Sequence, residues 1–275
     1  SGNRNSFNDV FGILEKLNHQ ILKNYKVDLM FVWNKQVGEK YKKFFDTNYI
    51  VSGSVLSNSM VKKNLKKDNC LIYISNFRTM HLKKNDFACK NITWSEFLKD
   101  EVELLNYLYI FCKEKKLKLK ILGKYLNTEL DKKFELEYFK KIINGENWDI
   151  IENNKDRNTY EIIDQAKIVA GTNSSLLFES LGRGNKTIFY TVRPNVYPIN
   201  TQTFGYLSNK PFKGPFWINK LDAKYFGEMT NKVNDLSQIE WNNLINPYLD
   251  DIVKFDPNNS IIKKRLKEFV VNAIK

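Results

Sequence analysis

Hydrophobic and polar residues alternate along the chain in blocks that match amphipathic helices and short strands. Apolar residues recur at helical intervals over 7–25, which predicts an amphipathic helix. Apolar runs of strand length follow at 28–33 and 49–53, and the polar segment 34–43 between them is long enough for a helix. We therefore expect a helix followed by a β-α-β unit in the first part of the chain.

A longer series of alternating elements begins at residue 71. Its first helix has a well-marked start, because Thr93 and Glu96 have the three-residue spacing of a capping box. The apolar pattern predicts strands at 71–75, 117–122, 148–151, 167–171 and 187–191. It predicts helices at 93–112, 131–143, 159–165, 174–181, 222–233, 238–248 and 260–274, with loops at 76–91 and beyond 191.

This alternation predicts a parallel sheet covered by helices on both faces, because parallel neighbours need a crossover connection and the crossover helix buries a face. The predicted fold class is α/β, with a doubly wound, Rossmann-like parallel sheet. We divide the chain into an N-terminal helix and β-α-β segment, 1–57, and a Rossmann-like domain with C-terminal helices, 58–275.

The composition is that of a folded protein with a strong positive charge. The 275 residues are 42% hydrophobic and 14% aromatic, enough for one substantial core. The net charge of +13 would suit a polyanionic partner. However, the basic stretches 61–67 and 113–120 alternate with apolar residues as solvated faces do, so we expect no nucleic-acid partner. Peripheral association with an anionic membrane surface is a second interpretation of this charge.

Cysteines and apolar runs indicate the compartment. Cys70, Cys89 and Cys112 are odd in number and have no metal-binding spacing, which favours a reducing environment. No run of about eighteen apolar residues and no signal-peptide core occurs. We therefore expect a cytoplasmic location, with the inner face of the membrane as the site of any association.

The predicted sheet also tells where to look for a ligand, since open parallel sheets bind ligands outside the carboxyl ends of their strands. The residues after the strands are small, hydroxylated or cationic, types that form hydrogen bonds with phosphates and sugars. The candidate binding residues there are Ser75, Asn76, Arg78, Gly123, Lys124, Thr172, Asn173, Ser174 and Ser175.

The turn from 169 to 175 is the most informative of these. Small residues let backbone amides approach a ligand, and the free N–H groups of a helix start favour an anion such as a phosphate. Glu179, about one turn further on, can reach a ribose, and Arg183 between two glycines is a candidate phosphate ligand. The alternative is that Thr172 and Ser174 merely cap a helix and that Glu179 is a solvated helix residue.

At this point the sequence resembles a known group of enzymes. The segments Tyr160–Asp164 and Ala166–Thr187 resemble the donor-binding lobe of GT-B glycosyltransferases. Gly53-Ser54, Tyr73–Arg78, Arg183-Gly184 and Gly214–Trp217 more narrowly resemble the bacterial surface carbohydrate and lipopolysaccharide biosynthesis proteins, to which glycosyltransferase activity is ascribed. The resemblance extends over about 28–241.

The resemblance implies a nucleotide-sugar donor and a glycan or lipid-linked acceptor. It implies that Ser174, Ser175 and Glu179 hold the phosphate and ribose, while Ser75, Asn76 and Arg78 face the same crevice. The first lobe is represented only by 7–53, so the catalytic base or nucleophile cannot be named. The His-Pro pair of some transferases for CMP-activated acidic sugars is missing, since neither His19 nor His81 precedes a proline.

Several questions stay open from the sequence. It contains no D-x-D motif and no paired carboxylate spacing, so we expect no metal and no other cofactor. His81 is expected to be exposed rather than catalytic, and Trp217 is equally compatible with stacking on a ligand and with anchoring a loop. A nucleotide-sugar epimerase, a polyol-phosphate transferase of the same architecture and a non-catalytic or nucleic-acid-binding module are the alternative functions.

Overall fold

The structure is a computed structural model that describes residues 14, 24–63, 66–89, 92–124, 128–151, 159–172, 174–192, 204 and 210–274. Its main sheet has seven strands: β3 (Asp68–Ile74), β6 (Lys118–Leu122), β7 (Trp148–Ile151), β8 (Ala166–Gly171), β9 (Thr187–Tyr190), β10 (Lys213–Gly214) and β11 (Trp217–Ile218). Their order is β10-β11-β9-β8-β3-β6-β7. Every neighbouring pair is parallel except β10 and β11.

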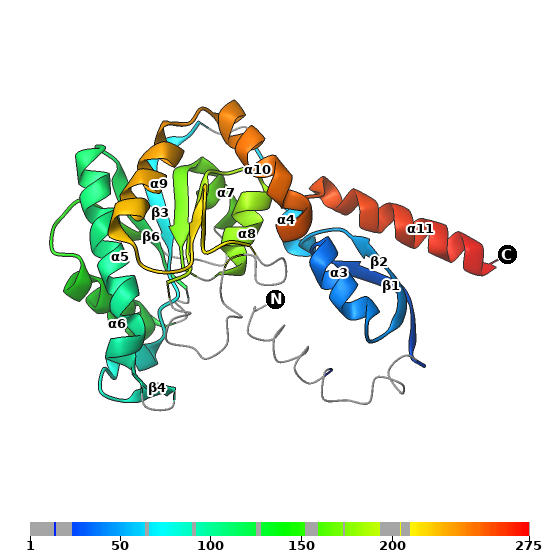
Figure 1. Cartoon of the computed structure of the whole chain (residues 1–275), viewed down its shortest axis with the longest axis horizontal. Helices are drawn as coiled ribbons and strands as arrows, with labels where there is room; N and C mark the ends of the chain where they lie inside the picture. The colour runs from blue at the N-terminus through cyan, green and yellow to red at the C-terminus, as the bar shows by residue number, and fades with distance from the viewer. Residues whose placement is uncertain are drawn as a thin grey trace.

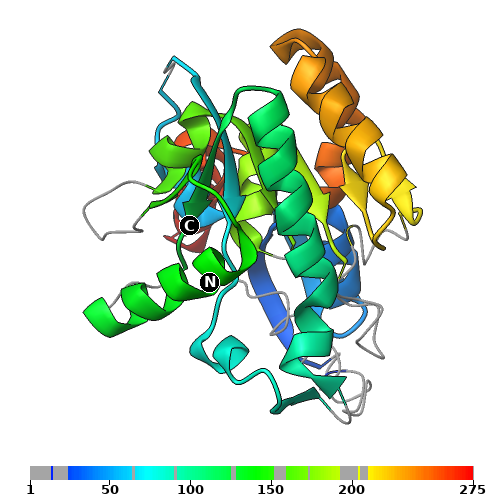
Figure 2. The ribbon, with the colours of Figure 1, turned by 90° about the vertical axis from the view of Figure 1, so that its left-hand side faces the viewer.

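Helices cover both faces of this sheet (Figure 1). On one face lie α5 (Trp94–Glu114) and α6 (Glu129–Ile142), and on the other lie α7 (Thr159–Gln165) and α8 (Ser175–Gly182). Seen from the side of α5, that helix runs along the sheet with the strands behind it (Figure 2). Two further helices, α9 (Ala223–Asp235) and α10 (Gln238–Ile252), follow β11. The predicted doubly wound α/β class is therefore confirmed.

The central strand shows why the sequence pattern predicted the fold. In β3 the five residues from Cys70 to Ile74 are all buried, at most 4% exposed. A strand covered by helices on both faces needs such a continuous apolar run rather than alternation. The predicted capping box is also present, since Glu96 N donates to Thr93 Oγ1 and Thr93 N donates to Glu96 Oε2. It fixes the start of α5 and so the face of α5 that buries Leu104, Leu105 and Leu108.

The first part of the chain forms a separate two-stranded parallel sheet. It consists of β1 (Lys26–Val32), α3 (Lys35–Lys42) and β2 (Asp46–Val51), and a short helix α4 (Val55–Ser59) leads away from it. The last residue of α10 lies beside the carboxyl end of β1, where Asn34 Nδ2 donates to Ile252 O at 2.8 Å. Gly53 has φ +76°, and a Cβ there would lie 1.9 Å from Lys254 O, so only glycine fits. Of the helix predicted at 7–25, only Leu14, Asn24 and Tyr25 are among the described residues.

The hydrophobic pattern of the sequence did not predict several short elements. The segment 76–91 was predicted as a loop but contains the 3₁₀ helix η1 (Thr79–Leu82) and β4 (Phe87–Cys89), which pairs with β5 (Ile92–Thr93). Strands β10 and β11 lie in the second predicted loop. These elements are two to four residues long, too short for a hydrophobic period to be recognised.

The chain ends in the 3₁₀ helix η5 (Pro257–Asn259) and α11 (Ser260–Ile274), which extends away from the rest of the molecule (Figure 1). Across the described ranges, none of the helices is both long enough and apolar enough to span a bilayer.

Candidate functional site

The centre of the main sheet contains a topological switch point between β3 and β8. These strands are neighbours, yet the chain leaves β3 toward β6 and leaves β8 toward β9 on the opposite side. Ile74 pairs with Gly171 in the parallel register, so the residues after the two strands lie side by side. In open α/β sheets, ligands bind in the crevice at such a point, outside the carboxyl ends of the strands. We call this place the β3–β8 crevice.

Two of the predicted site residues meet directly in the β3–β8 crevice. Asn76, half-buried after β3, donates from Nδ2 to Oγ1 of the buried Thr172 after β8, at 3.0 Å. Ser174 and Ser175 follow as the N-cap and first residue of α8, and both are half-buried. Ser174 Oγ accepts from Leu176 N at 3.3 Å. Ser174 therefore caps the helix, as the alternative interpretation of the sequence expected. Asn173 lies outside the described residues.

Ser75 is held by a carboxylate that the sequence did not single out. Its hydroxyl accepts from Phe77 N at 3.1 Å and donates to Oε1 of Glu135 on α6. Lys124 N also donates to this Oε1, at 3.3 Å, so Glu135 links the carboxyl ends of β3 and β6. Glu135 is fully buried and its Oε2 has no hydrogen-bond partner among the described residues. Burial raises the pKa of the Glu135 carboxyl, opposed by its bonds to Ser75 and Lys124 N.

Gly123, Lys124 and Arg78 occupy different surroundings. Gly123 N donates to Ile151 O at 3.0 Å, so this amide continues the pairing of β6 with β7 and is not free for a ligand. Lys124 is half-buried directly after β6, and Arg78 is exposed at the N-cap of η1. Both cations therefore follow strands next to the β3–β8 crevice.

Glu179 is buried on α8 rather than solvated. Its Oε1 accepts from Ser54 Oγ at 2.5 Å and its Oε2 accepts from Tyr160 OH at 3.0 Å. Burial raises the pKa of its carboxyl, while these two hydrogen bonds and the Arg183 charge oppose the rise. Glu179 thereby connects the chain after the small sheet to α7 and α8.

Arg183 differs from its predicted role. Its side chain is 0% exposed and forms an ion pair with Asp164 on α7, through Nε and Nη2. Nη1 donates to the carbonyl oxygens of Ser57 and Met60, at 2.9 and 3.0 Å. With its donors used in this way, the guanidinium joins α7, α8 and α4 and offers no surface to a phosphate. The prediction of Arg183 as a phosphate ligand was wrong because sequence does not show burial.

The structure also shows the surroundings of Trp217 and His81, whose roles the sequence left open. Trp217 is 1% exposed, stacks on Phe204 and donates from Nε1 to Pro211 O at 2.9 Å, so it anchors a loop to the core. His81 is buried beside Phe77 and Trp94, and its Nδ1 accepts from Arg78 N at 3.3 Å. The expectation of an exposed His81 was wrong, because the segment around it folds as η1 against α5 and α6.

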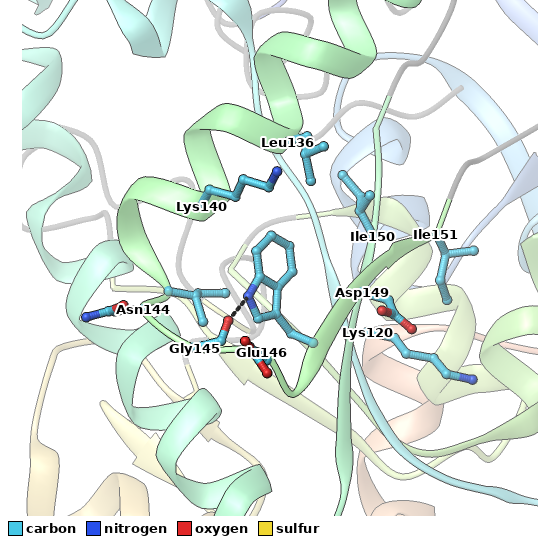
Figure 3. Close-up of a pocket in the computed structure, with 11 residues that line it drawn as sticks. Lys120, Leu136, Lys140, Asn144, Gly145, Glu146, Asp149, Ile150 and Ile151 are labelled. Carbon is cyan, nitrogen blue, oxygen red and sulfur yellow. Dashed lines mark hydrogen bonds between the residues drawn. The ribbon is translucent and has the colours of Figure 1, made fainter.

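A pocket of about 1050 Å³ lies elsewhere, at the β7 edge of the sheet (Figure 3). Trp148 lines this pocket and donates from its indole Nε1 to Gly145 O at 3.0 Å. Lys140 of α6 points toward the same space, and Asp149 and Lys120 lie on the strand side. None of the predicted site residues that the structure describes lines this pocket, so these residues and the pocket form separate places on the sheet.

A comparison with protein families decides the affiliation of the chain. A family described as "putative O-antigen biosynthesis protein" matches residues 1–270. The chain belongs to this family. The sequence resemblance to bacterial surface carbohydrate biosynthesis proteins is thereby confirmed.

The O-antigen biosynthesis family member is similar to a structure of the wall teichoic acid polymerase TagF, with 13% identity and a TM-score of 0.48. The similarity covers 88% of this chain and 58% of that one, so the chain spans little more than half the length of TagF. No curated protein matches it.

Proposed function

We propose that this chain is a glycosyltransferase domain of the GT-B type, which binds a nucleotide-activated sugar in the β3–β8 crevice. It transfers the sugar to a glycan or lipid-linked acceptor during synthesis of a bacterial surface polysaccharide such as lipopolysaccharide. Membership of an O-antigen biosynthesis family supports the biological process. The chemistry of the β3–β8 crevice supports the nucleotide-sugar donor.

The observation that carries the proposal is the contact between Asn76 and Thr172. It joins the carboxyl ends of the two strands at the topological switch point, where this class of sheet binds nucleotides. The next residues along the chain, Ser174 and Ser175, place the N-terminus of α8 at the same end of the sheet. A helix start offers free backbone N–H groups to a phosphate, and the helix dipole favours the negative charge.

In this proposal, different polar groups of the β3–β8 crevice bind different parts of the donor. Ser174 and Ser175 hold the phosphates, together with the Ser175 amide at the start of α8, and Lys124 and Arg78 supply positive charge. Each oxygen of the Glu179 carboxylate already has one partner and can accept a second hydrogen bond from a ribose hydroxyl. Positive charge and the helix start also stabilise the phosphate that departs when the glycosidic bond forms. Binding and transfer proceed without a metal or other cofactor.

Nucleotide titration of Asn76 and Thr172 variants tests the proposal. Isothermal titration with UDP, GDP, CDP and CMP should find at least one ligand. Asn76→Ala and Thr172→Val should weaken its binding by roughly tenfold or more, since each removes a hydrogen-bonding group beside a charged ligand. Asn231→Ala is the matched control, because Asn231 forms its hydrogen bond with Gly227 O within α9.

Two outcomes would contradict the proposal. In the first, none of the four nucleotides binds or raises the melting temperature. In the second, the Asn76 and Thr172 variants bind as the wild type does, which would place the ligand elsewhere. Analysis of the products formed from a nucleotide sugar separates glycosyl transfer from epimerisation and from polyol-phosphate transfer, and EDTA tests independence from metals.

A further inference from the structure

Helix α11 carries an apolar surface that the other described residues of the chain leave exposed. It projects from the body of the protein beyond the small sheet (Figure 1). Leu266, Phe269, Val270 and Val271 are 46%, 43%, 52% and 46% exposed. Four large apolar side chains exposed together on one helix are unusual for a surface that faces only water.

The apolar residues of α11 follow the helical period. Ile262, Leu266, Phe269 and Val270 are spaced i, i+4, i+7 and i+8, which places them on one face of the helix. This is the pattern of a helix that buries one stripe against another surface. Here the stripe includes Leu266, Phe269 and Val270, which remain exposed, so the described residues of this chain do not bury it.

Positive charges surround this stripe. Lys263, Lys264, Arg265 and Lys267 lie within the same turns and are exposed. Glu268 is the only acidic residue in α11, and it lies 3.0 Å from Arg265 Nη1 and 4.0 Å from Lys264 Nζ. The described side chains of the helix therefore carry an excess of three positive charges.

The base of α11 is fixed to the body of the protein. Asp256 caps the helix, because its carboxylate accepts from Ser260 Oγ and, at 2.8 Å, from Ile261 N. Asn259 Nδ2 donates to Val55 O at 3.0 Å and so holds the helix base against α4. Val55 and Leu56 at this junction are themselves 58% and 59% exposed. Further apolar surface thus adjoins the base of the helix.

We propose that α11 is an interfacial membrane-binding helix that recognises anionic lipid. Its apolar stripe inserts among the acyl chains at the bilayer surface, and its lysines and arginine contact anionic headgroups with their aliphatic stems against the apolar region. The charge pattern favours a lipid surface over a second copy of the chain. Two copies of α11 packed together would bring their cationic flanks close, which opposes association.

Vesicle co-sedimentation of the full chain tests this proposal. The probes are vesicles of phosphatidylcholine alone and of phosphatidylcholine with phosphatidylglycerol. Wild type should partition at least several-fold more strongly to the anionic vesicles. Leu266→Gln with Phe269→Gln should reduce that partitioning by about tenfold or more, since two large side chains lose their apolar burial. Lys264→Gln with Lys267→Gln should remove most of the preference for anionic lipid.

The matched control is Ile239→Gln on α10, because Ile239 is 74% exposed and lies outside α11. It should bind vesicles as the wild type does. Equal partitioning of the Leu266/Phe269 variant and wild type would overturn the proposal, as would a wild-type dimer that the same variant dissociates, seen by light scattering. Circular dichroism verifies that the variants fold. Nucleotide affinity should be unchanged in every α11 variant, so a failure here is distinguishable from a failure of the proposed donor site.

Discussion

Glu179 of α8 and Arg183, the C-cap residue that follows this helix, lie four residues apart and are both charged groups packed inside the protein. Each is buried, and each is bonded to a residue from the segment after β2 and to a residue of α7. The rings of Tyr160 and Phe255 lie about 5 Å from the guanidinium carbon, at 5.1 and 4.9 Å. This packing makes the Arg183–Asp164 pair a stabilising contact between segments that are distant in sequence.

Removal of Asp164 should therefore be costly. Asp164→Ala leaves a buried guanidinium without its counter-ion and should lower the free energy of unfolding by about 3–5 kcal/mol. Urea denaturation followed by circular dichroism measures the change. The control is Asp149→Ala, which breaks an ion pair with Lys118 between side chains 55% and 44% exposed and should cost under about 1 kcal/mol. Similar losses in both variants would show that burial does not strengthen the Asp164 pair.

Helices α5 and α6 each carry a glutamate whose pKa is shifted, in opposite directions. On α6, burial raises the pKa of Glu135 above 4.5. On α5, Glu96 is exposed and the hydrogen bonds from Thr93 lower its pKa below 4.5. The folded protein therefore holds a proton on Glu135 more tightly than the unfolded chain does, and a proton on Glu96 less tightly. The stability that the Glu135 proton contributes is lost as pH rises through the raised pKa of Glu135 in the folded protein. The stability that the Glu96 charge contributes is lost as pH falls through the lowered pKa of Glu96 in the folded protein.

Two isosteric variants should reveal these opposite signs in urea unfolding between pH 3 and pH 8, a range of about five units. Relative to wild type, Glu135→Gln should gain stability as pH rises above 4.5, by at most about 1.4 kcal/mol per pH unit while Glu135 titrates. Glu96→Gln should instead lose stability as pH rises toward and above 4.5, because only the charged carboxylate strengthens the cap of α5. Parallel pH profiles for the two variants would contradict the assignment.

The elements of the main sheet and its helices were predictable from sequence where they are long or have a clear hydrophobic pattern. The capping box at Thr93 located α5, and the continuous apolar run of β3 located the centre of the sheet. The position of the crevice followed from strand order, since a doubly wound sheet binds ligands at strand ends. Asn76 and Thr172 were both found in this way, although their mutual contact was not.

The sequence did not show which charged side chains are buried or which distant residues they contact. Arg183 was taken for a ligand because an arginine between glycines is chemically suited to phosphate, while its partner Asp164 lies nineteen residues away. The position of Glu135 relative to Phe139 could have indicated from sequence that Glu135 is buried. It precedes the buried Phe139 by four residues and therefore lies on the same inward face of α6.

The whole molecule carries a net charge of +13. The two proposals assign roles to the positive charges at two places, the β3–β8 crevice and α11. Cations near the crevice face a small anionic donor, and those of α11 face a lipid surface. Neither proposal involves the long groove of aromatic and basic residues with which proteins bind single-stranded nucleic acids. The charge therefore does not by itself indicate a nucleic-acid protein.

A salt titration checks this conclusion. In fluorescence anisotropy, labelled duplex DNA and RNA should bind weakly, with dissociation constants no tighter than the roughly 10⁻⁴–10⁻⁶ M of non-specific binding. Tight binding that falls by about a thousandfold or more between 50 and 200 mM salt would instead indicate a protein that neutralises many phosphates.

The order of strands in the main sheet also has a consequence for how the protein is made. Strand β3 emerges from the ribosome well before its partner β8, which follows after roughly a hundred residues of chain. Until β8 is synthesised, one edge of β3, with its continuous apolar run, has no neighbour and is open to pairing with another nascent chain. The strand that completes the β3–β8 crevice is thus also the one that protects the half-made sheet, and a chain truncated before β8 should aggregate rather than fold.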